Sequence, residues 1–326
     1  MARMTALYRN FAESDAPAVA ALVSRLYPDR AVSATELLNA DRDQQNAGSR
    51  HARFLALAPG GELAGFSAYD QSLGQFHPRR FRLEVIVAPE WRQQGIGAAL
   101  YAWAETQLLT VNALTVRSNV SEDDEAAQRF ARQRGFAEER RTWVSSLDVT
   151  HFDAAPYAGL EARLLAGGVQ LLSAADLARQ HPHDWQARLH ALFSEVRLDV
   201  PRSDPATPIS LSQYREWILE DPGFLPEAFI LARTQGGELV GQSDLYRSQN
   251  SPDLFIGLTG VQRAWRGLGL ATALKLRGVR YAQAQGVARI WTDNESSNAP
   301  MLRVNERLGF VREPARLSVV RHWPEV

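Results

Sequence analysis

The sequence predicts a mixed α/β fold built twice, as two tandem domains that each hold a mixed central sheet flanked by helices. The chain of 326 residues is longer than one hydrophobic core usually organises. Three segments recur in the same order and at nearly the same spacing, which is typical of an internal duplication. Within each copy, the apolar pattern alternates between strand-like and helix-like periods in the same order.

The repeated segments each contain glycine and share their order along the chain. They are LALAPGGELAGFSAYD (55–70) with ILARTQGGELVGQSDLY (230–246), EWRQQGIGAAL (90–100) with AWRGLGLATAL (264–274), and RFARQRGF (129–136) with RVNERLGF (303–310). We therefore predict one domain at residues 1–152 and a second at residues 153–326. The linker between them is expected near residues 150–159.

The elements of the two copies are expected in one order, from an opening helical region to a closing strand. The ranges are helices at 16–26 and 174–196, hairpin turns at the glycine pairs 60–61 and 236–237, apolar strands at 81–88 and 253–261, and further strands at 114–117 and 289–293. A glycine-rich turn and a helix follow each apolar strand, and a later helix ends at a Gly-Phe pair. The second copy alone has a proline-rich insertion at residues 198–210, which fits either a lid or a plain surface loop.

Composition excludes several classes of function. The net charge is −1 and no block of basic residues occurs, which disfavours binding to nucleic acid or to an anionic membrane. The chain has no cysteine, so disulfides, thiolate metal sites and a cysteine acyl-enzyme are excluded. The histidines show no metal-binding spacing, and no metal site is expected. No run of 18 apolar residues occurs, so we expect a cytoplasmic protein.

The glycine-rich turns predict a binding site for a pyrophosphate group. A strand, a bare turn and a helix together direct free backbone N–H groups and the positive end of a helix dipole at an anion. Arginine at the start of the turn adds a charged hydrogen-bond donor. Both copies have the pattern Arg-x-x-Gly-x-Gly/Ala, at Arg92, Gly95 and Gly97 and again from Arg266 to Ala271.

This pattern resembles the GNAT superfamily of acyl-CoA-dependent N-acetyltransferases, in its tandem form similar to mycothiol-synthase-like acetyltransferases. The resemblance covers nearly the whole chain and implies acetyl-CoA as cofactor, with one molecule in each domain if both turns are functional. It implies a small-molecule amine as acceptor, which attacks the acetyl thioester directly in a ternary complex, and no nucleic-acid or membrane partner. A monomer and a homodimer are both compatible with a duplicated chain.

The resemblance implies a set of coenzyme-binding residues in each copy. In the first copy they are Val85, Val87, Arg92, Gln93, Gln94, Gly95, Ile96, Gly97 and Ala98, and in the second they are Thr259, Val261, Arg266, Gly267, Leu268, Gly269, Leu270, Ala271, Asn298 and Asn305. The strand residues would offer main-chain groups to the pantetheine arm and the acetyl carbonyl. Asn298 and Asn305 could instead serve as a helix cap and a surface polar residue.

The catalytic groups depart from the family pattern. In many members, a tyrosine four residues before the Gly-Phe glycine acts as the general acid that protonates the departing thiolate. This sequence has Ala131 and Asn305 at those two positions. Candidate general bases are Glu84 in the first copy and Asp293 and Glu295 in the second. Asp244 lies on the second hairpin, and we expect it, like most carboxylates, to be solvated.

Two other functions remain open at this stage. The missing tyrosines favour a non-catalytic module that binds or senses acyl-CoA. Tandem relatives that transfer amino acids from aminoacyl-tRNA would need to bind RNA, which the neutral charge disfavours. Of the two copies, the second is expected to be the main catalytic domain.

Overall fold

The chain folds into two compact units, which are described separately. The computed structural model describes residues 6–323; residues 1–5 and 324–326, which the predicted domain ranges include, lie outside the described residues. The first unit comprises residues up to Arg141 together with the segment from Pro314 onwards, and the second comprises Thr142–Glu313.

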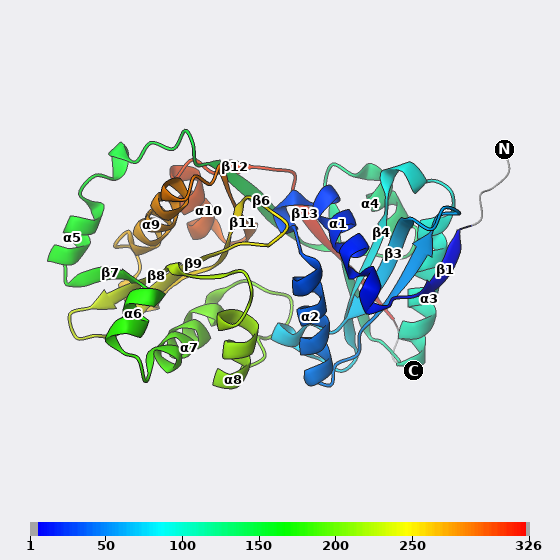
Figure 1. The fold of residues 1–326 in the computed structure, drawn as a ribbon, viewed down its shortest axis with the longest axis horizontal. Helices are drawn as coiled ribbons and strands as arrows, with labels where there is room; N and C mark the ends of the chain where they lie inside the picture. Colours follow the sequence, from blue (N-terminus) through cyan, green and yellow to red (C-terminus); the bar gives the residue numbers. More distant parts are fainter. Residues whose placement is uncertain (1–5, 324–326) are drawn as a thin grey trace. The chain divides into compact units, whose positions relative to one another are not determined.

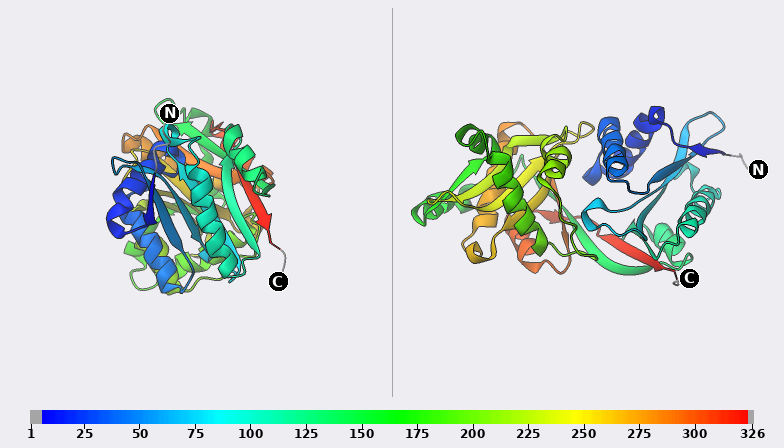
Figure 2. Two further views of the ribbon diagram at one scale, coloured as in Figure 1. Left: turned by 90° about the vertical axis from the view of Figure 1, so that its right-hand side faces the viewer. Right: turned by 90° about the horizontal axis from the view of Figure 1, so that it is seen from below.

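The first unit is a mixed sheet with helices on both faces (Figures 1 and 2). Its strand order is β1-β2-β3-β4-β5-β13, and all pairs are antiparallel except β4 with β5. Its elements are β1 (Leu7–Asn10), α1 (Ala16–Leu26), α2 (Ala34–Asn46), β2 (Ala52–Leu57), β3 (Leu63–Asp70), β4 (Arg80–Val87), α3 (Ile96–Thr110), β5 (Thr115–Ser121), α4 (Glu125–Arg132) and β13 (Arg316–His322).

The second unit repeats this plan. Its strand order is β7-β8-β9-β10-β11-β6, with β12 also paired to β6, and β10 and β11 are the parallel pair. Its elements are β6 (Ala137–Asp148, of which residues 142–148 belong to this unit), α5 (Leu160–Ala166), β7 (Val169–Ser173), α6 (Ala174–Gln180), α7 (Trp185–Val196), α8 (Leu211–Tyr214), β8 (Phe224–Thr234), β9 (Leu239–Tyr246), β10 (Leu254–Val261), α9 (Leu270–Ala284), β11 (Arg289–Glu295), α10 (Ala299–Arg307) and β12 (Val311–Arg312).

The closing strands do not stay with their own sequence repeat. Residues 142–148 of β6, which end the first repeat, pair with β11 of the second unit. The last long strand of the chain, β13, pairs along its whole length with β5 of the first unit. The compact units therefore differ from the division at residue 152 that the repeat predicts, because each sheet takes its last strand from the other repeat.

Apolar side chains on both faces of each sheet explain why the helices pack there. In the first unit, Val19 and Leu22 of α1 pack on one face and Leu100 of α3 on the other. In the second unit, α6, α7 and α8 cover one face around Phe229 and Leu231, and α9 covers the opposite face around Leu274. The pattern of one apolar stripe per helix accounts for this layering.

Most predicted elements are confirmed, with one clear exception. Helix α1 has the predicted bounds, and each predicted strand is present to within a few residues. The helical region expected at 174–196 is two helices, separated at His181–Asp184. Pro182 explains the break, because proline cannot supply the backbone N–H that a helix interior needs.

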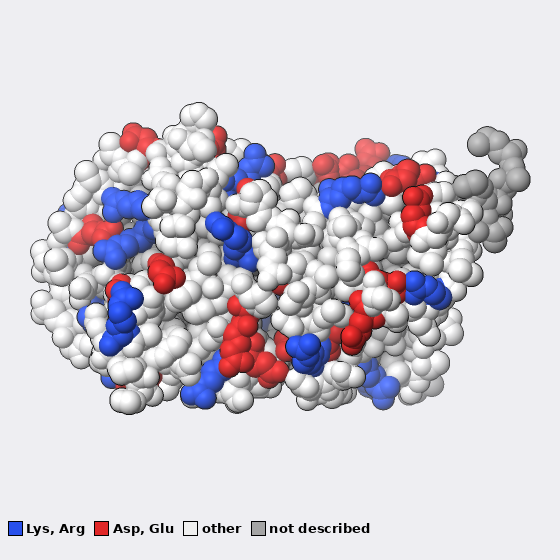
Figure 3. Space-filling view, in the orientation of Figure 1, with Lys and Arg blue, Asp and Glu red and all other residues white. Residues whose placement is uncertain are grey.

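Charged side chains of both signs are interspersed on the face of the described residues drawn in Figure 3. Part of this mixture consists of ion pairs within one unit, such as Glu161 with Arg277 and Arg280. None of the helices in the described part of the chain is long and apolar enough to cross a membrane.

Candidate active site

In both units the two parallel strands pair only where they begin and then separate. In the second unit, Leu254 and Phe255 of β10 pair with Ile290 and Trp291 of β11, and the register given for this pair ends there. In the first unit, three residues of β4 from Arg80 pair with three of β5. The remaining residues of β10 and β4 thus present backbone groups at a strand edge, where an extended ligand can form hydrogen bonds.

The predicted glycine turn lies at the carboxyl end of β10. Gly267 and Gly269 have φ angles of 81° and 84°, in the left-handed region that favours glycine. Helix α9 begins at Leu270, so its first N–H groups, which have no acceptor inside the helix, face this turn. The turn and the helix dipole together favour an anion at this position.

The arginine of the turn is held in the same way in both units. Nε of Arg266 donates to the carbonyl oxygen of Val261 at 3.0 Å, and Nε of Arg92 donates to that of Val87 at 3.1 Å. This bond fixes the guanidinium beside the end of the strand and leaves its terminal nitrogens for other partners. The shared geometry agrees with a duplicated phosphate-binding element.

The two turns differ in their other contacts. Gln93 in the first unit adopts a φ of 61°, a left-handed conformation that its counterpart Gly267 adopts without strain. Arg266 also pairs with Asp199, which ends the short 3-10 helix that precedes most of the proline-rich insertion. Hydrogen bonds from Arg263 and Arg266 hold the pKa of Asp199 well below its usual range. A bound phosphate would compete with Asp199 for Arg266.

Helix α10 carries the two asparagines that the sequence singles out. The side chain of Asn298 accepts a hydrogen bond from the Met301 backbone at 3.4 Å and caps the helix. Asn305 is buried, with Oδ1 accepting from Nζ of Lys275 at 2.7 Å and Nδ2 donating to Oδ1 of Asn294 at 2.5 Å. The first unit has Asp124 as the cap of α4, and its carboxylate lies 3.6 Å from Arg92.

Of the three candidate bases, Glu84 lies on β4 of the first unit, and Asp293 and Glu295 both lie on β11 of the second. Glu84 forms an ion pair with Arg30 at 2.9 Å, and Asp293 is exposed on β11. Glu295 accepts a hydrogen bond from the backbone of Ser297 at 2.8 Å, which fits the role of a turn cap. As catalytic groups these residues stay predictions.

Asp244 on β9 was expected to be solvated, and that expectation is wrong. Its Oδ1 accepts a hydrogen bond from the backbone of Leu258 at 2.9 Å. Burial raises the pKa of Asp244 to about 6, although hydrogen bonds from Leu258 and Gln242 act in the opposite direction. The residue as a whole is half-buried. By the alternation of β9, Asp244 shares its face of the strand with Gln242, which is also buried.

Tyr214 of α8 lies in the same environment. Its ring is fully buried, and no hydrogen-bond partner of its hydroxyl is found among the described residues. Burial raises its pKa above the ordinary range, and the charge of Asp244 adds to the shift. Asp244 and Tyr214 thus place two polar groups on the face of the sheet that α6, α7 and α8 cover.

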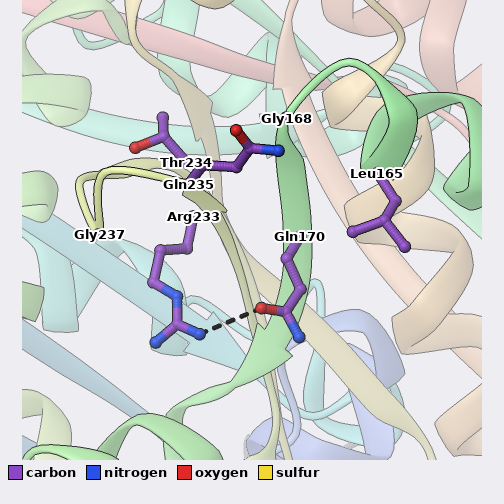
Figure 4. Close-up of a pocket in the computed structure, with 7 residues that line it drawn as sticks. All are labelled: Leu165, Gly168, Gln170, Arg233, Thr234, Gln235 and Gly237. Atoms are coloured by element: carbon purple, nitrogen blue, oxygen red, sulfur yellow. Dashed lines mark hydrogen bonds between the residues drawn. The ribbon is translucent and has the colours of Figure 1, made fainter.

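A shallow pocket elsewhere in the second unit does not involve these residues. It lies at the edge strand β7 and the β8–β9 turn, where Arg233 donates to Gln170 at 3.1 Å (Figure 4). Strands β8 and β9 separate β7 from β10 in the sheet.

No cluster of metal-ligating side chains is found in the part of the chain that the structure describes.

A sheet that opens beside a glycine turn and a helix N-terminus is suited to an extended, phosphate-bearing ligand. Comparison with known proteins agrees. The acetyltransferase (GNAT) family model matches residues 18–136 and 189–310. A mycothiol acetyltransferase of Thermobispora bispora is 30% identical over 270 residues, covering 81% of this chain and 82% of that protein. Another, of Thermobifida fusca, is 26% identical over 292 residues, covering 86% and 85%.

Solved structures show the same fold. A tandem GNAT protein from the clavulanic acid biosynthesis pathway is 20% identical, with a TM-score of 0.71, and covers 99% of this chain and 100% of its own. A GCN5-related N-acetyltransferase from Sphaerobacter thermophilus is 21% identical, with a TM-score of 0.69, and covers 100% and 98%. The chain belongs to the acetyltransferase (GNAT) family and is an N-acetyltransferase. Members of this family use acetyl-CoA as the acyl donor.

Proposed function

We propose that the protein transfers the acetyl group of acetyl-CoA to the amine of a small molecule, by direct attack in a ternary complex formed in the second unit. The pyrophosphate of the coenzyme would lie on the turn from Arg266 to Ala271. Its pantetheine arm would run along the open edge of β10. The acceptor would approach from the face that carries Asp244.

A β-bulge in β10 is the observation that carries this proposal. Strand β10 pairs with β9 with one extra residue between Ile256 and Thr259, whereas β4 pairs with β3 without any such shift. A bulge leaves backbone groups unpaired and redirects them, which is how a strand can present a donor to a reacting carbonyl. A side chain on Gly257 would overlap Asp244, because its Cβ would clash with Oδ2 of the carboxyl. The bulge and the Asp244 carboxyl therefore lie in direct contact, and the space for the carboxyl depends on glycine at position 257.

Asp244 supplies the general base in this account. An amine is protonated at neutral pH and cannot attack a thioester until it loses a proton. A carboxyl group with a pKa of about 6 is ionised at pH 7 and accepts that proton, directly or through water.

The first unit lacks these features. Its strand β4 has no bulge in its pairing with β3, and so has no counterpart of the bulge beside Asp244. We infer that the first unit supports the fold and that the tight coenzyme site belongs to the second.

Thiol release tests the proposal directly. Purified protein is mixed with acetyl-CoA and a panel of small amines, and free coenzyme A is measured with a thiol reagent. The protein contains no cysteine, so it contributes no background. The panel begins with the acceptor of mycothiol acetyltransferases, because proteins of that name are the similar ones.

Matched glycine variants assign the reaction to one unit. Gly269→Glu and Gly95→Glu place the same charge at turns with φ angles of 84° and 88°. We expect Gly269→Glu to remove thiol release and Gly95→Glu to preserve most of it. Coenzyme binding without release on any amine would favour the alternative, a non-catalytic acyl-CoA-binding module.

A further inference from the structure

We propose that the amine of Lys275 holds the thiolate of coenzyme A as it leaves, in the place where many members of the family use a tyrosine. This inference rests on the proposed function of the second unit. It concerns one step, the departure of sulfur from the tetrahedral intermediate, and it assigns that step to a residue that the sequence motifs do not include.

Lys275 is the only lysine in the chain. The other 35 of its 36 basic residues are arginine. Arginine and lysine carry the same charge at neutral pH, but only lysine can lose its proton in a protein. A chain that uses arginine at every other basic position and lysine at one buried position indicates that this position needs an amine.

The lysine is buried without an ion pair. Its relative exposure is 2%, and its Nζ donates to Oδ1 of Asn305 at 2.7 Å, the single hydrogen bond found for it among the described residues. The ring of Phe310 lies 5.3 Å from Nζ. Burying an ammonium group with one neutral partner is costly, since a charge in the interior needs compensation. For two of its three N–H donors no hydrogen-bond partner is found among the described residues.

Asn305 places this amine at the position of the missing acid. An amide has no proton that it can transfer, so Asn305 cannot perform the role of the tyrosine. Its two ends are both engaged, one by Lys275 and the other by Asn294 on β11. Asn305 therefore acts as a positioning residue that orients Nζ between α9 and β11.

The charges around Lys275 leave its amine able to titrate near neutrality. Burial lowers the pKa of Lys275 to about 7, and the charge of Asp293 on β11 opposes the shift only in part. On its own helix, Arg277 and Arg280 pair with Glu161. The remaining charged groups of β11 and α10 are Arg289, Glu295, Arg303, Glu306 and Arg307.

The chemistry balances with this assignment. The acceptor nitrogen bonds to the acetyl carbon, and the carbon–sulfur bond breaks with its electron pair going to sulfur. Lys275 donates an N–H to that sulfur, and the proton passes to it as coenzyme A is released. Of the two protons that the acceptor nitrogen loses, one leaves through Asp244 to water and the other restores Lys275.

A single lysine makes the test direct. Protein labelled with ¹³C-lysine has one side-chain Cε resonance, whose pH titration reports the protonation of Lys275 alone. The titration is recorded for the free protein, for its complex with coenzyme A and for its complex with desulfo-coenzyme A, which lacks the sulfur. Calorimetry measures binding of both ligands under the same conditions.

We expect the resonance to titrate near neutrality in the free protein and in the desulfo complex. Coenzyme A should raise the pKa of Lys275 by at least about one unit, because a thiolate stabilises the ammonium form. In Lys275→Met, the turnover of acetyl-CoA with its best amine should fall at least about 100-fold. Arg280→Met removes a charge from the exposed side of α9 and serves as the control, with near wild-type turnover expected.

Two results would overturn the assignment while leaving the proposed function intact. One is binding of both ligands with the same titration of Lys275 in each complex. The other is a titration near the ordinary value of lysine. If neither ligand binds, the coenzyme site itself is absent and both proposals fail.

Discussion

At the residue scale, the proposed site depends on two ionisable groups whose pKa values are shifted toward 7, one from below and one from above. Burial raises the pKa of Asp244 and lowers that of Lys275. Asp244 lies on the face of the sheet covered by α6, α7 and α8, and Lys275 on the face covered by α9. Groups with such shifted pKa values are typical of acid–base sites, because each can exchange a proton near neutral pH.

Replacing Asp244 with asparagine should separate activity from stability. The folded protein binds the proton of Asp244 more tightly than the unfolded chain, since the pKa is raised on folding. The free energy of unfolding should therefore fall as the pH rises from about 4 to about 6. Asp244→Asn should remove this fall and raise stability at pH 7 by up to about 3 kcal/mol, since one pKa unit corresponds to about 1.4 kcal/mol.

Activity should change in the opposite direction. A general base typically accelerates a reaction by a factor of about 10² to 10⁴, so we expect a loss of that size in kcat/KM for Asp244→Asn. In the wild type, kcat/KM should decline as the pH falls through about 6, where Asp244 becomes protonated. Thermal unfolding and thiol-release rates measured across this range test both effects. A variant that is less stable and equally active would contradict the assignment.

At the element scale, the bulge in β10 distinguishes the second unit from the first. The bulge needs Gly257, because a Cβ there would meet Asp244. It also aims the backbone N–H of Leu258 at the carboxyl oxygen. The strand, rather than any one side chain, thus sets the position of the base.

Gly257→Ala should disturb the site more than the fold. The added methyl must displace the Asp244 carboxyl, and we expect kcat/KM to fall by about 100-fold, in the range found for a misplaced catalytic group. Gly236→Ala, in the β8–β9 turn, meets only ordinary contacts at 3.7 Å and is the matched control. Equal activities of the two variants would show that the bulge has no catalytic role.

The sequence predicts elements and turns better than it predicts side-chain environments. The helix at Ala16–Leu26, the apolar strands and both glycine turns follow from local periodicity and backbone requirements. The bulge and the burial of Asp244 depend on pairing between strands that lie apart in the sequence, which periodicity does not report. Lys275 is different, because its uniqueness is visible in the composition even though its contact with Asn305 is not.

At the scale of the whole molecule, the exchange of closing strands joins the two sequence repeats. Strand β13 completes the first sheet, and residues 142–148 of β6 complete the second. The repeats alone do not reveal this, since each contains a closing strand of its own. A cut at residue 152 would remove β13 from the first sheet and β6 from the second. The strands that they cover would then expose unpaired backbone groups, which favours aggregation.

Separate expression of residues 1–152 and 153–326 tests this feature. We expect each half to be poorly folded or aggregated alone, because the first lacks β13 and the second lacks β6. Co-expression of the two halves should restore a folded complex, as judged by circular dichroism and by thermal unfolding. Two stable and independent halves would support the division that the repeat predicts.

The count and location of acetyl-CoA sites test the central claim most directly. Calorimetric titration of the wild type, Gly95→Glu and Gly269→Glu gives both quantities. We predict one tight site, retained in Gly95→Glu and lost in Gly269→Glu, because the second unit holds the bulged strand. Loss of binding in Gly95→Glu alone, or no binding in the wild type, would contradict the account.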